Sequence, residues 1–106
     1  MGQSAMPTDE LIYYVADFFK VFSDSTRFKL LCALRRGEMS VGDIAAAIGM
    51  TQSSVSHQLR VLRQNDIVKF RRDGKAVYYS LDDEHVSALI EAGIEHILHL
   101  RGNVPR

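Results

Sequence analysis

Residues 40–65 read SVGDIAAAIGMTQSSVSHQLRVLRQN, and this stretch decides the fold. Ser40 is a helix-capping residue, and the apolar residues after it recur at helical spacing, which predicts a short helix over Val41–Ile48. Gly49 is a helix stop, and Thr51 caps a second helix predicted over about Gln52–Asn65. Two short helices joined by a tight glycine turn are typical of a helix-turn-helix.

The pattern changes after this stretch from helical spacing to β-rich runs. Strands are predicted at Ile67–Arg71 and Ala76–Ser80, and Arg72–Lys75 between them contains Asp-Gly, a strong hairpin turn signal. A helix-turn-helix followed by a basic hairpin makes a winged helix. The predicted fold class is therefore mainly α with a β-hairpin wing.

Further helices are predicted on both sides of this unit. Apolar spacing and capping residues place them at about Thr8–Phe22, from Ser25 to Gly37, and from Asp82 or Asp83 to about Leu100. A chain of 106 residues is enough for one compact domain and too short for two. We expect a flexible N-terminal arm over residues 1–7, a winged-helix DNA-binding and dimerisation domain over 8–101, and a tail over 102–106.

Several protein classes are disfavoured by the composition. No apolar run approaches the roughly 20 residues of a membrane span, and Met1–Asp9 lacks the pattern of a secretory signal. We therefore expect a cytoplasmic protein with no membrane partner. The single cysteine, Cys32, allows no intrachain disulfide, and its leucine neighbours predict a small core residue.

The formal net charge is zero, but the charge is unevenly distributed. Between Gln52 and Ser80 six basic and two acidic residues give a net +4, which predicts an anionic partner. The helix-turn-helix pattern predicts that this partner is double-stranded DNA. Short polar side chains at a helix start suit entry into a major groove. For His57 two roles stay open, DNA contact or support of the helix. The predicted DNA-binding residues are Gln52, Ser53, Ser54, Ser56, His57, Arg60 and Arg63 in the helix, and Arg71, Arg72 and Lys75 in the wing.

The last predicted helix has a different character, because it combines acids with histidines. Asp83 precedes it, and His85, His96 and His99 lie in it; carboxylates and neutral imidazoles bind zinc, cobalt and nickel. His96 and His99 share a helix face. His85 and His96, however, are roughly 16 Å apart along the axis at about 1.5 Å per residue. One helix cannot close this site.

Two antiparallel copies of the helix can close it. Asp83 and His85 of one chain then lie beside His96 and His99 of the other, and two-fold symmetry gives two equivalent sites. An apolar stripe runs beside the histidines, and since its burial requires a partner, we expect a homodimer even without metal. The predicted dimer-interface residues are Val86, Leu89, Ile90, Gly93 and Ile97 in the last helix, with Tyr14 and Phe18 in the first.

These motifs together resemble the ArsR/SmtB family of metal-sensing winged-helix repressors. The resemblance runs from about Leu11 to His99 and is carried by Phe22–Arg27, Thr51–Leu59, Arg72–Lys75 and Tyr78–Leu81. The Asp-x-His plus His-x-x-His pattern that begins at Asp83 is similar to that of the family's zinc-sensing branch. The cysteine-based metal sites of the family's other branches have no match in this sequence.

The resemblance implies a mechanism as well as a fold. It implies an apo dimer that binds an inverted-repeat operator, and zinc binding at inter-subunit sites of the last helix that releases the DNA and derepresses a metal efflux gene.

Three other interpretations use the same ligands. The first is a nickel or cobalt sensor with two further ligands, for which Asp9 and Glu10 are the candidates. The second is a winged-helix regulator with a constitutive structural zinc. The third is a metal hydrolase, but four protein ligands fill a tetrahedral ion and leave no position for water, as catalytic zinc requires. We therefore expect no enzyme activity.

Overall fold

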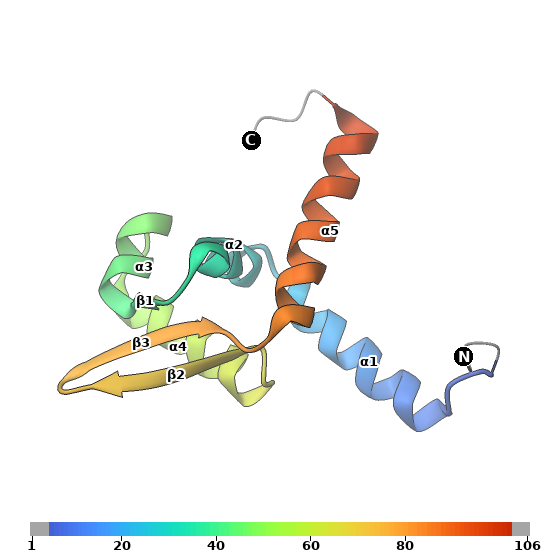
Figure 1. Cartoon of the computed structure of the whole chain (residues 1–106), viewed down its shortest axis with the longest axis horizontal. Helices are drawn as coiled ribbons and strands as arrows, with labels where there is room; N and C mark the ends of the chain where they lie inside the picture. The colour runs from blue at the N-terminus through green and yellow to red at the C-terminus, as the bar shows by residue number, and fades with distance from the viewer. Residues whose placement is uncertain (1–4, 103–106) are drawn as a thin grey trace.

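The computed structural model describes residues 5–102. Five α-helices, a short 3₁₀ turn and three strands follow one another in this part of the chain, and Figure 1 shows their arrangement. The outer parts of the predicted arm (residues 1–4) and tail (residues 103–106) lie outside the described residues.

The helix-turn-helix forms where the sequence predicts it. Helix α3 spans Val41–Ile48 and helix α4 spans Gln52–Gln64. The hydroxyls of Ser40 and Thr51 cap them by accepting hydrogen bonds from backbone N–H groups three residues on, both at 3.1 Å. Gly49 ends α3 with φ 69° and ψ 39°, a left-handed conformation that glycine adopts at little cost.

The wing has three strands. The hairpin consists of β2 (Val68–Asp73) and β3 (Ala76–Leu81), and the two-residue strand β1 (Met39–Ser40) pairs with the free edge of β3, which gives the order β1-β3-β2 with all pairs antiparallel. The predicted winged-helix class is confirmed, with β1 as an addition. A two-residue strand has no periodicity that a sequence pattern can reveal.

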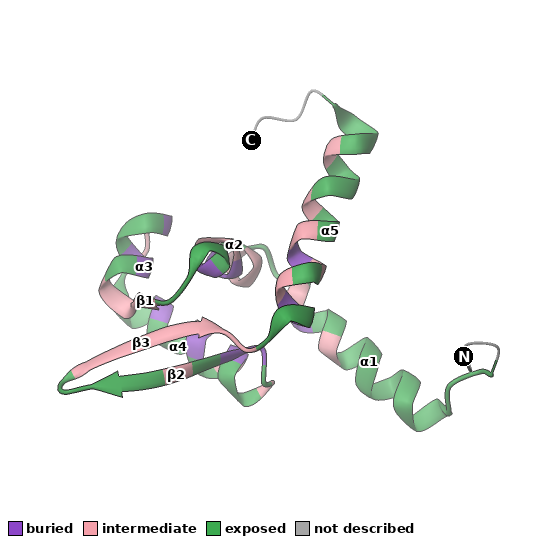
Figure 2. Cartoon of the chain, in the orientation of Figure 1, coloured by how far each residue is buried: buried purple, intermediate pink, exposed green. Residues whose placement is uncertain are grey.

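The remaining helices are α1 (Asp9–Phe22), α2 (Ser25–Ala33, continued by a 3₁₀ turn over Leu34–Arg36) and α5 (Glu84–Arg101). The core lies between α2, α3, α4 and the base of the wing, and it includes Leu30, Leu31, Ile44, Leu59, Leu62 and Ile67, each 0% exposed. α1 and α5 leave this body in different directions, and most of α1 and the outer part of α5 are exposed (Figures 1 and 2).

The first half of α5 corrects one sequence-based argument. Val86 and Ile90 are only 3% and 0% exposed within the single chain, because they pack on the chain's own core. The expectation that these two residues need a partner for burial, and so mark the dimer interface, is therefore wrong. An ion pair between Arg35 and Glu91 at 3.5 Å also fastens this half of α5 to the body. Beyond it Gly93 and Ile97 are exposed, while Leu89 is half-buried.

Candidate nucleic-acid interface and metal ligands

The N-terminal end of α4 presents short polar side chains to solvent. Gln52, Ser53, Ser54, Ser56 and His57 are all exposed, while Val55 and Leu59 between them are 0% exposed and hold the helix in the core. The side-chain amide of Gln52 lies beside Gly42 of α3: a Cβ placed on Gly42 would meet the amide nitrogen at 3.5 Å, an ordinary van der Waals distance. The start of α4 therefore lies beside the start of α3.

A side chain from α2 supports α4 from behind. The Nε of Arg27 donates a hydrogen bond of 3.0 Å to Oε1 of Gln58 in a half-buried position. Arg27 itself is held by the N-cap of α2, since its backbone N–H donates to the carboxylate of Asp24. Sequence reasoning missed this contact, because the two residues are 31 positions apart. Their contact depends on how α2 crosses α4.

Helix α4 and the wing are joined by stacked side chains. The guanidinium of Arg63 lies 3.9 Å from the centroid of the Phe70 ring, and that of Arg72 lies 5.6 Å from the same ring. Tyr79 of β3, the register partner of Phe70, has its ring centroid 5.9 Å away. Cations over aromatic faces attract the ring electrons, so Phe70 holds two predicted DNA-binding arginines beside each other.

An open hollow of about 710 Å³ lies between the C-terminal half of α4 and the start of β2. Basic side chains gather there from both elements, and its lining comprises Arg60, Arg63, Gln64, Asp66, Val68, Lys69, Phe70 and Asp82. Lys69 and Phe70 were not among the residues predicted to serve DNA binding. An aromatic residue flanked by basic residues in a predicted wing strand was the signal for Phe70 in the sequence.

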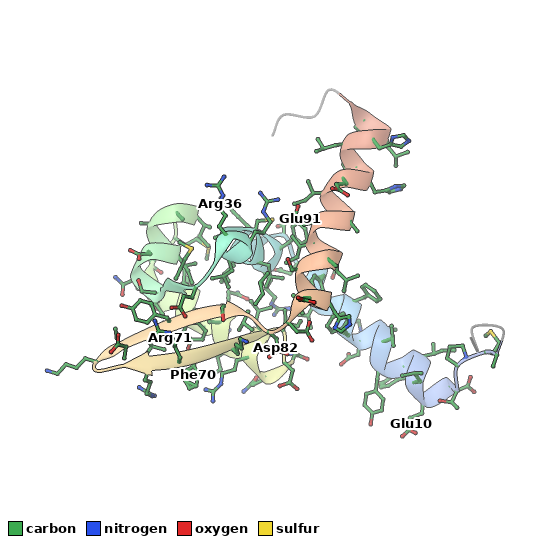
Figure 3. All side chains as sticks on the ribbon, viewed as in Figure 1. Glu10, Arg36, Phe70, Arg71, Asp82 and Glu91 are labelled. Carbon is green, nitrogen blue, oxygen red and sulfur yellow. The ribbon has the colours of Figure 1, made fainter. Side chains whose placement is uncertain are left out.

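The opposite face of the wing is arranged differently. Successive residues of a strand point to opposite faces, and Figure 3 shows Phe70 and Arg71 on opposite sides of the hairpin. The guanidinium of Arg71 donates to both carboxylate oxygens of Glu38 at 2.6–3.0 Å and lies 4.8 Å from the Tyr78 ring centroid. The hydrogen bond from Arg71 lowers the pKa of Glu38, so this carboxylate is ionised at neutral pH.

The four predicted metal ligands lie in two pairs at opposite ends of α5. Asp83 is the N-cap, with φ −155° and ψ −177°, and its Oδ1 accepts from the backbone N–H groups of His85 and Val86. Its other oxygen lies 3.4 Å from Nδ1 of His85. His96 and His99 are exposed near the C-terminal end. Within residues 5–102 of one chain, no group of three or more histidine, cysteine or acidic side chains gathers as a metal site.

The chemistry of these groups suits a hard or borderline divalent ion. Hydrogen bonds from the N–H of Val86, and secondarily from His85, lower the pKa of Asp83, so that it carries its charge. Cys32 is half-buried, and burial raises the pKa of its thiol, which disfavours the thiolate that soft metals need.

In the described part of the chain, no helix is long and apolar enough to cross a membrane.

The comparison with known proteins agrees with this architecture. Residues 24–69 match the model of the family described as "Bacterial regulatory protein, arsR family". A curated relative, the transcriptional repressor SmtB homolog of Synechocystis, is 47% identical over 83 residues, which cover 78% of this chain and 63% of that relative. The matched segment thus spans less than two thirds of that protein.

Two solved structures are similar over nearly the whole chain. The AntR antimony-specific transcriptional repressor gives a TM-score of 0.85 at 33% identity and covers 97% of this chain and 94% of its own. The homodimeric winged helix-turn-helix domain Mb0332 of Mycobacterium bovis is described as a possible ArsR-family regulator. It gives a TM-score of 0.80 at 28% identity, and the match covers 100% of this chain and 99% of that domain. These similar proteins are described as regulators or repressors of transcription.

Proposed function

Because this chain belongs to the ArsR family of bacterial regulatory proteins, we propose that it is a homodimeric, metal-responsive transcriptional repressor that releases its operator DNA when zinc binds. Repressors are not enzymes, and at the level of the family this supports the expectation of no enzyme activity. The metal, the operator and the residues involved are proposed from the arrangement of side chains.

The DNA-binding surface consists of the exposed start of α4 and the wing. Support comes from the exposure of Gln52, Ser53, Ser54, Ser56 and His57, and from the basic residues Arg60, Arg63, Arg72 and Lys75 that follow on the helix and hairpin. The short side chains fit a major groove and the cations fit phosphates. A two-fold dimer presents two such helices, and it therefore recognises an inverted-repeat operator.

We place the dimer interface on apolar residues of α1 and α5 that are exposed or half-buried in the single chain. Tyr13, Tyr14, Ile97 and Leu100 are 72%, 64%, 48% and 64% exposed in the single chain. Exposed apolar residues clustered on two helices mark an interaction surface. We assign Tyr14, Phe18, Leu89, Gly93 and Ile97 to it. Gly93 faces open space in the single chain, and its lack of a side chain permits close approach of a partner helix.

The separation of the ligand pairs is the observation that carries the metal proposal. α5 is 18 residues long, with Asp83 and His85 at its start and His96 and His99 near its end. An antiparallel partner helix brings the two pairs together at two equivalent sites. Three imidazoles and one carboxylate complete the tetrahedral set that zinc prefers, while cobalt and nickel accept the same donors. When bound, the metal links the two α5 helices of the dimer.

Zinc held by these residues would change how the two winged units are set relative to each other. Each α5 follows directly from the wing through Leu81–Asp83, so that a link between the helices is also a link between the wings. A histidine that binds the metal through one ring nitrogen can donate a hydrogen bond from the other. We propose that such a bond to the backbone near Asn65–Ile67 further connects the metal site to the junction of α4 and the wing. Release of DNA then derepresses transcription of a metal efflux gene, in keeping with the resemblance to zinc-sensing repressors.

The decisive experiment is a DNA-binding titration with and without zinc. An operator is first selected from random duplex DNA with the apo protein, and its affinity is then measured by fluorescence anisotropy in chelator and in added zinc. We expect tight binding in chelator and loss of affinity in zinc. Equal affinities in the two conditions, with zinc bound, indicate a structural zinc. A response to nickel and cobalt but not to zinc indicates the alternative sensor with extra ligands such as Asp9 and Glu10.

A further inference from the structure

One of the wing's three predicted phosphate contacts, Arg71, already has the Nε–Nη2 edge of its guanidinium paired with a carboxylate. Its Nε donates to both carboxylate oxygens of Glu38, at 3.0 and 2.9 Å, and its Nη2 donates to one of them at 2.6 Å. The same guanidinium lies 4.8 Å from the Tyr78 ring centroid. A carboxylate on the fork of an arginine uses the same donors, in the same geometry, as a phosphate does.

The other basic side chains of this region have no such partner. Arg63 and Arg72 contact the face of Phe70, which leaves their N–H edges available, and among residues 5–102 neither is in a salt bridge or a side-chain hydrogen bond. Lys75, next to the hairpin turn, is exposed. Arg71 thus differs from its neighbours although the sequence presents all of them as equivalent cations.

The position of Glu38 lets the ion pair connect the wing to helix α3. Glu38 immediately precedes β1, whereas Arg71 lies on β2, and the middle strand β3 separates the two. Tyr78 of β3 is the register partner of both Ser40 and Arg71, so the pair bridges all three strands. Ser40, two residues after Glu38, is the N-cap of α3. The ion pair therefore ties the outer strand of the wing to the first helix of the helix-turn-helix.

We infer that Glu38 is a positioning residue for DNA binding, which holds the wing through Arg71 and keeps that arginine off the DNA phosphates. This inference rests on the proposed DNA-binding function and gives Arg71 a role other than the phosphate contact that the sequence predicts. Arg71 sets the orientation of the wing, and Arg72 and Lys75 make the phosphate contacts. Glu38 also lowers the positive charge of the wing by one, which limits binding to DNA of unrelated sequence.

The salt dependence of DNA binding tests this role, because it counts phosphate contacts. Each contact adds about 0.9 to the slope of log affinity against log salt. The test compares wild type, Glu38→Gln, Arg71→Gln and the double variant on the selected operator and on unrelated duplex DNA, with Arg72→Gln as the matched control. Both side chains of the pair are surface-exposed, at 40% and 53%, so we expect these variants to fold, which circular dichroism checks.

Four results are expected. Arg71→Gln leaves the slope unchanged, whereas Arg72→Gln lowers it by about 0.9. Glu38→Gln frees Arg71 for a phosphate and steepens the slope by about 0.9, so that affinity falls about threefold more than in wild type between 50 and 200 mM salt. The double variant returns to the wild-type slope. The ratio of operator to unrelated-DNA affinity falls in Glu38→Gln.

Two outcomes overturn the inference while the proposed function stands. The first is a slope that drops in Arg71→Gln as much as in Arg72→Gln. The second is a Glu38→Gln protein with the wild-type slope. If the wild-type protein shows no salt-dependent affinity for duplex DNA, the proposed function fails and the inference fails with it. Should Glu38→Gln not fold, the slopes of Arg71→Gln and Arg72→Gln decide the question alone.

Discussion

The backbone N–H of Asp82 donates a hydrogen bond of 2.9 Å to the carbonyl oxygen of Ile67. Ile67 is 0% exposed and lies between the end of α4 and the start of β2. Asp82 directly precedes Asp83, the N-cap of α5 and a proposed metal ligand. The start of α5, where one of the two proposed ligand pairs lies, is therefore one residue and one hydrogen bond away from the junction of α4 and the wing. A movement of α5 that displaces Asp82 would act on this junction through that hydrogen bond.

His96→Ala is expected to separate metal response from DNA binding. The variant should dimerise and bind the operator as wild type does without metal, because His96 is exposed near the C-terminal end of α5 and is not among the proposed DNA-binding residues. It should lose zinc-driven release, which in wild type should amount to about 1–3 kcal/mol, or about 5–150-fold in operator affinity. Anisotropy titrations with and without zinc measure this. Glu95→Ala, one residue away and also exposed, is the control and should respond normally.

A mixture of variant chains tests whether the metal site is shared. His85→Ala and His96→Ala homodimers each carry a lesion in both sites. In the heterodimer both lesions fall in one site, and the other is intact. Refolded mixtures should therefore regain zinc binding near native affinity, at one site per heterodimer, as measured by competition with a chromophoric chelator. Failure to regain it, together with zinc still held by either homodimer, would rule out an inter-subunit site.

Tyr14→Asp should weaken the dimer without unfolding the chain. Tyr14 is 64% exposed in the single chain, so a charge there costs nothing until a partner covers it. We expect the dimer dissociation constant to rise about tenfold or more, as for a buried interface aromatic. Sedimentation equilibrium of apo protein measures it. Ala47→Asp, on the exposed side of α3, should leave the dimer unchanged; a wild-type apo protein that is monomeric at micromolar concentration would refute the interface.

Phe70→Ala should reduce DNA affinity although Phe70 carries no charge. Its ring orders Arg63 and Arg72, and each exposed cation–π contact is worth about 0.5–1 kcal/mol. Loss of both should weaken operator binding about five- to thirtyfold. Phe70→Tyr keeps the ring and serves as the control. Equal affinity of the alanine and tyrosine variants, with the sheet intact by circular dichroism, would show that the stack does not order the arginines for binding.

Acid should abolish the effect of Glu38 on stability. Arg71 lowers the pKa of Glu38 in the folded protein, so its stabilising effect is complete above the ordinary glutamate pKa of about 4.3 and is lost as the pH falls through the lowered folded value. Thermal unfolding of wild type and Glu38→Gln should therefore differ at pH 7 and converge at strongly acid pH. A difference in melting temperature that persists in acid would mean that the glutamate acts through packing rather than charge.

The sequence by itself determined the five α-helices, the hairpin and their order, but not the short strand β1. Ser40 and Thr51 cap the helices they were predicted to cap, and Gly49 and Gly74 take the left-handed conformations of the predicted stop and turn, with φ 69° and 63°. These features depend on neighbours within about four residues, so local spacing is enough to reveal them. The division of the proposed ligands into two distant pairs follows equally from the rise of a helix.

Only the tertiary structure decided what the side chains of the wing and of α5 contact. Strand alternation puts Phe70 and Arg71 on opposite faces, but nothing local indicates that Glu38, 33 residues away, meets Arg71. That contact requires β1 to pair with β3, a register fixed by the packing of the whole domain. Val86 and Ile90 likewise looked like interface residues until α5 was placed against the core. Contacts between residues far apart in the chain depend on how the elements pack, and the spacing of residues along one element gives no information about that packing.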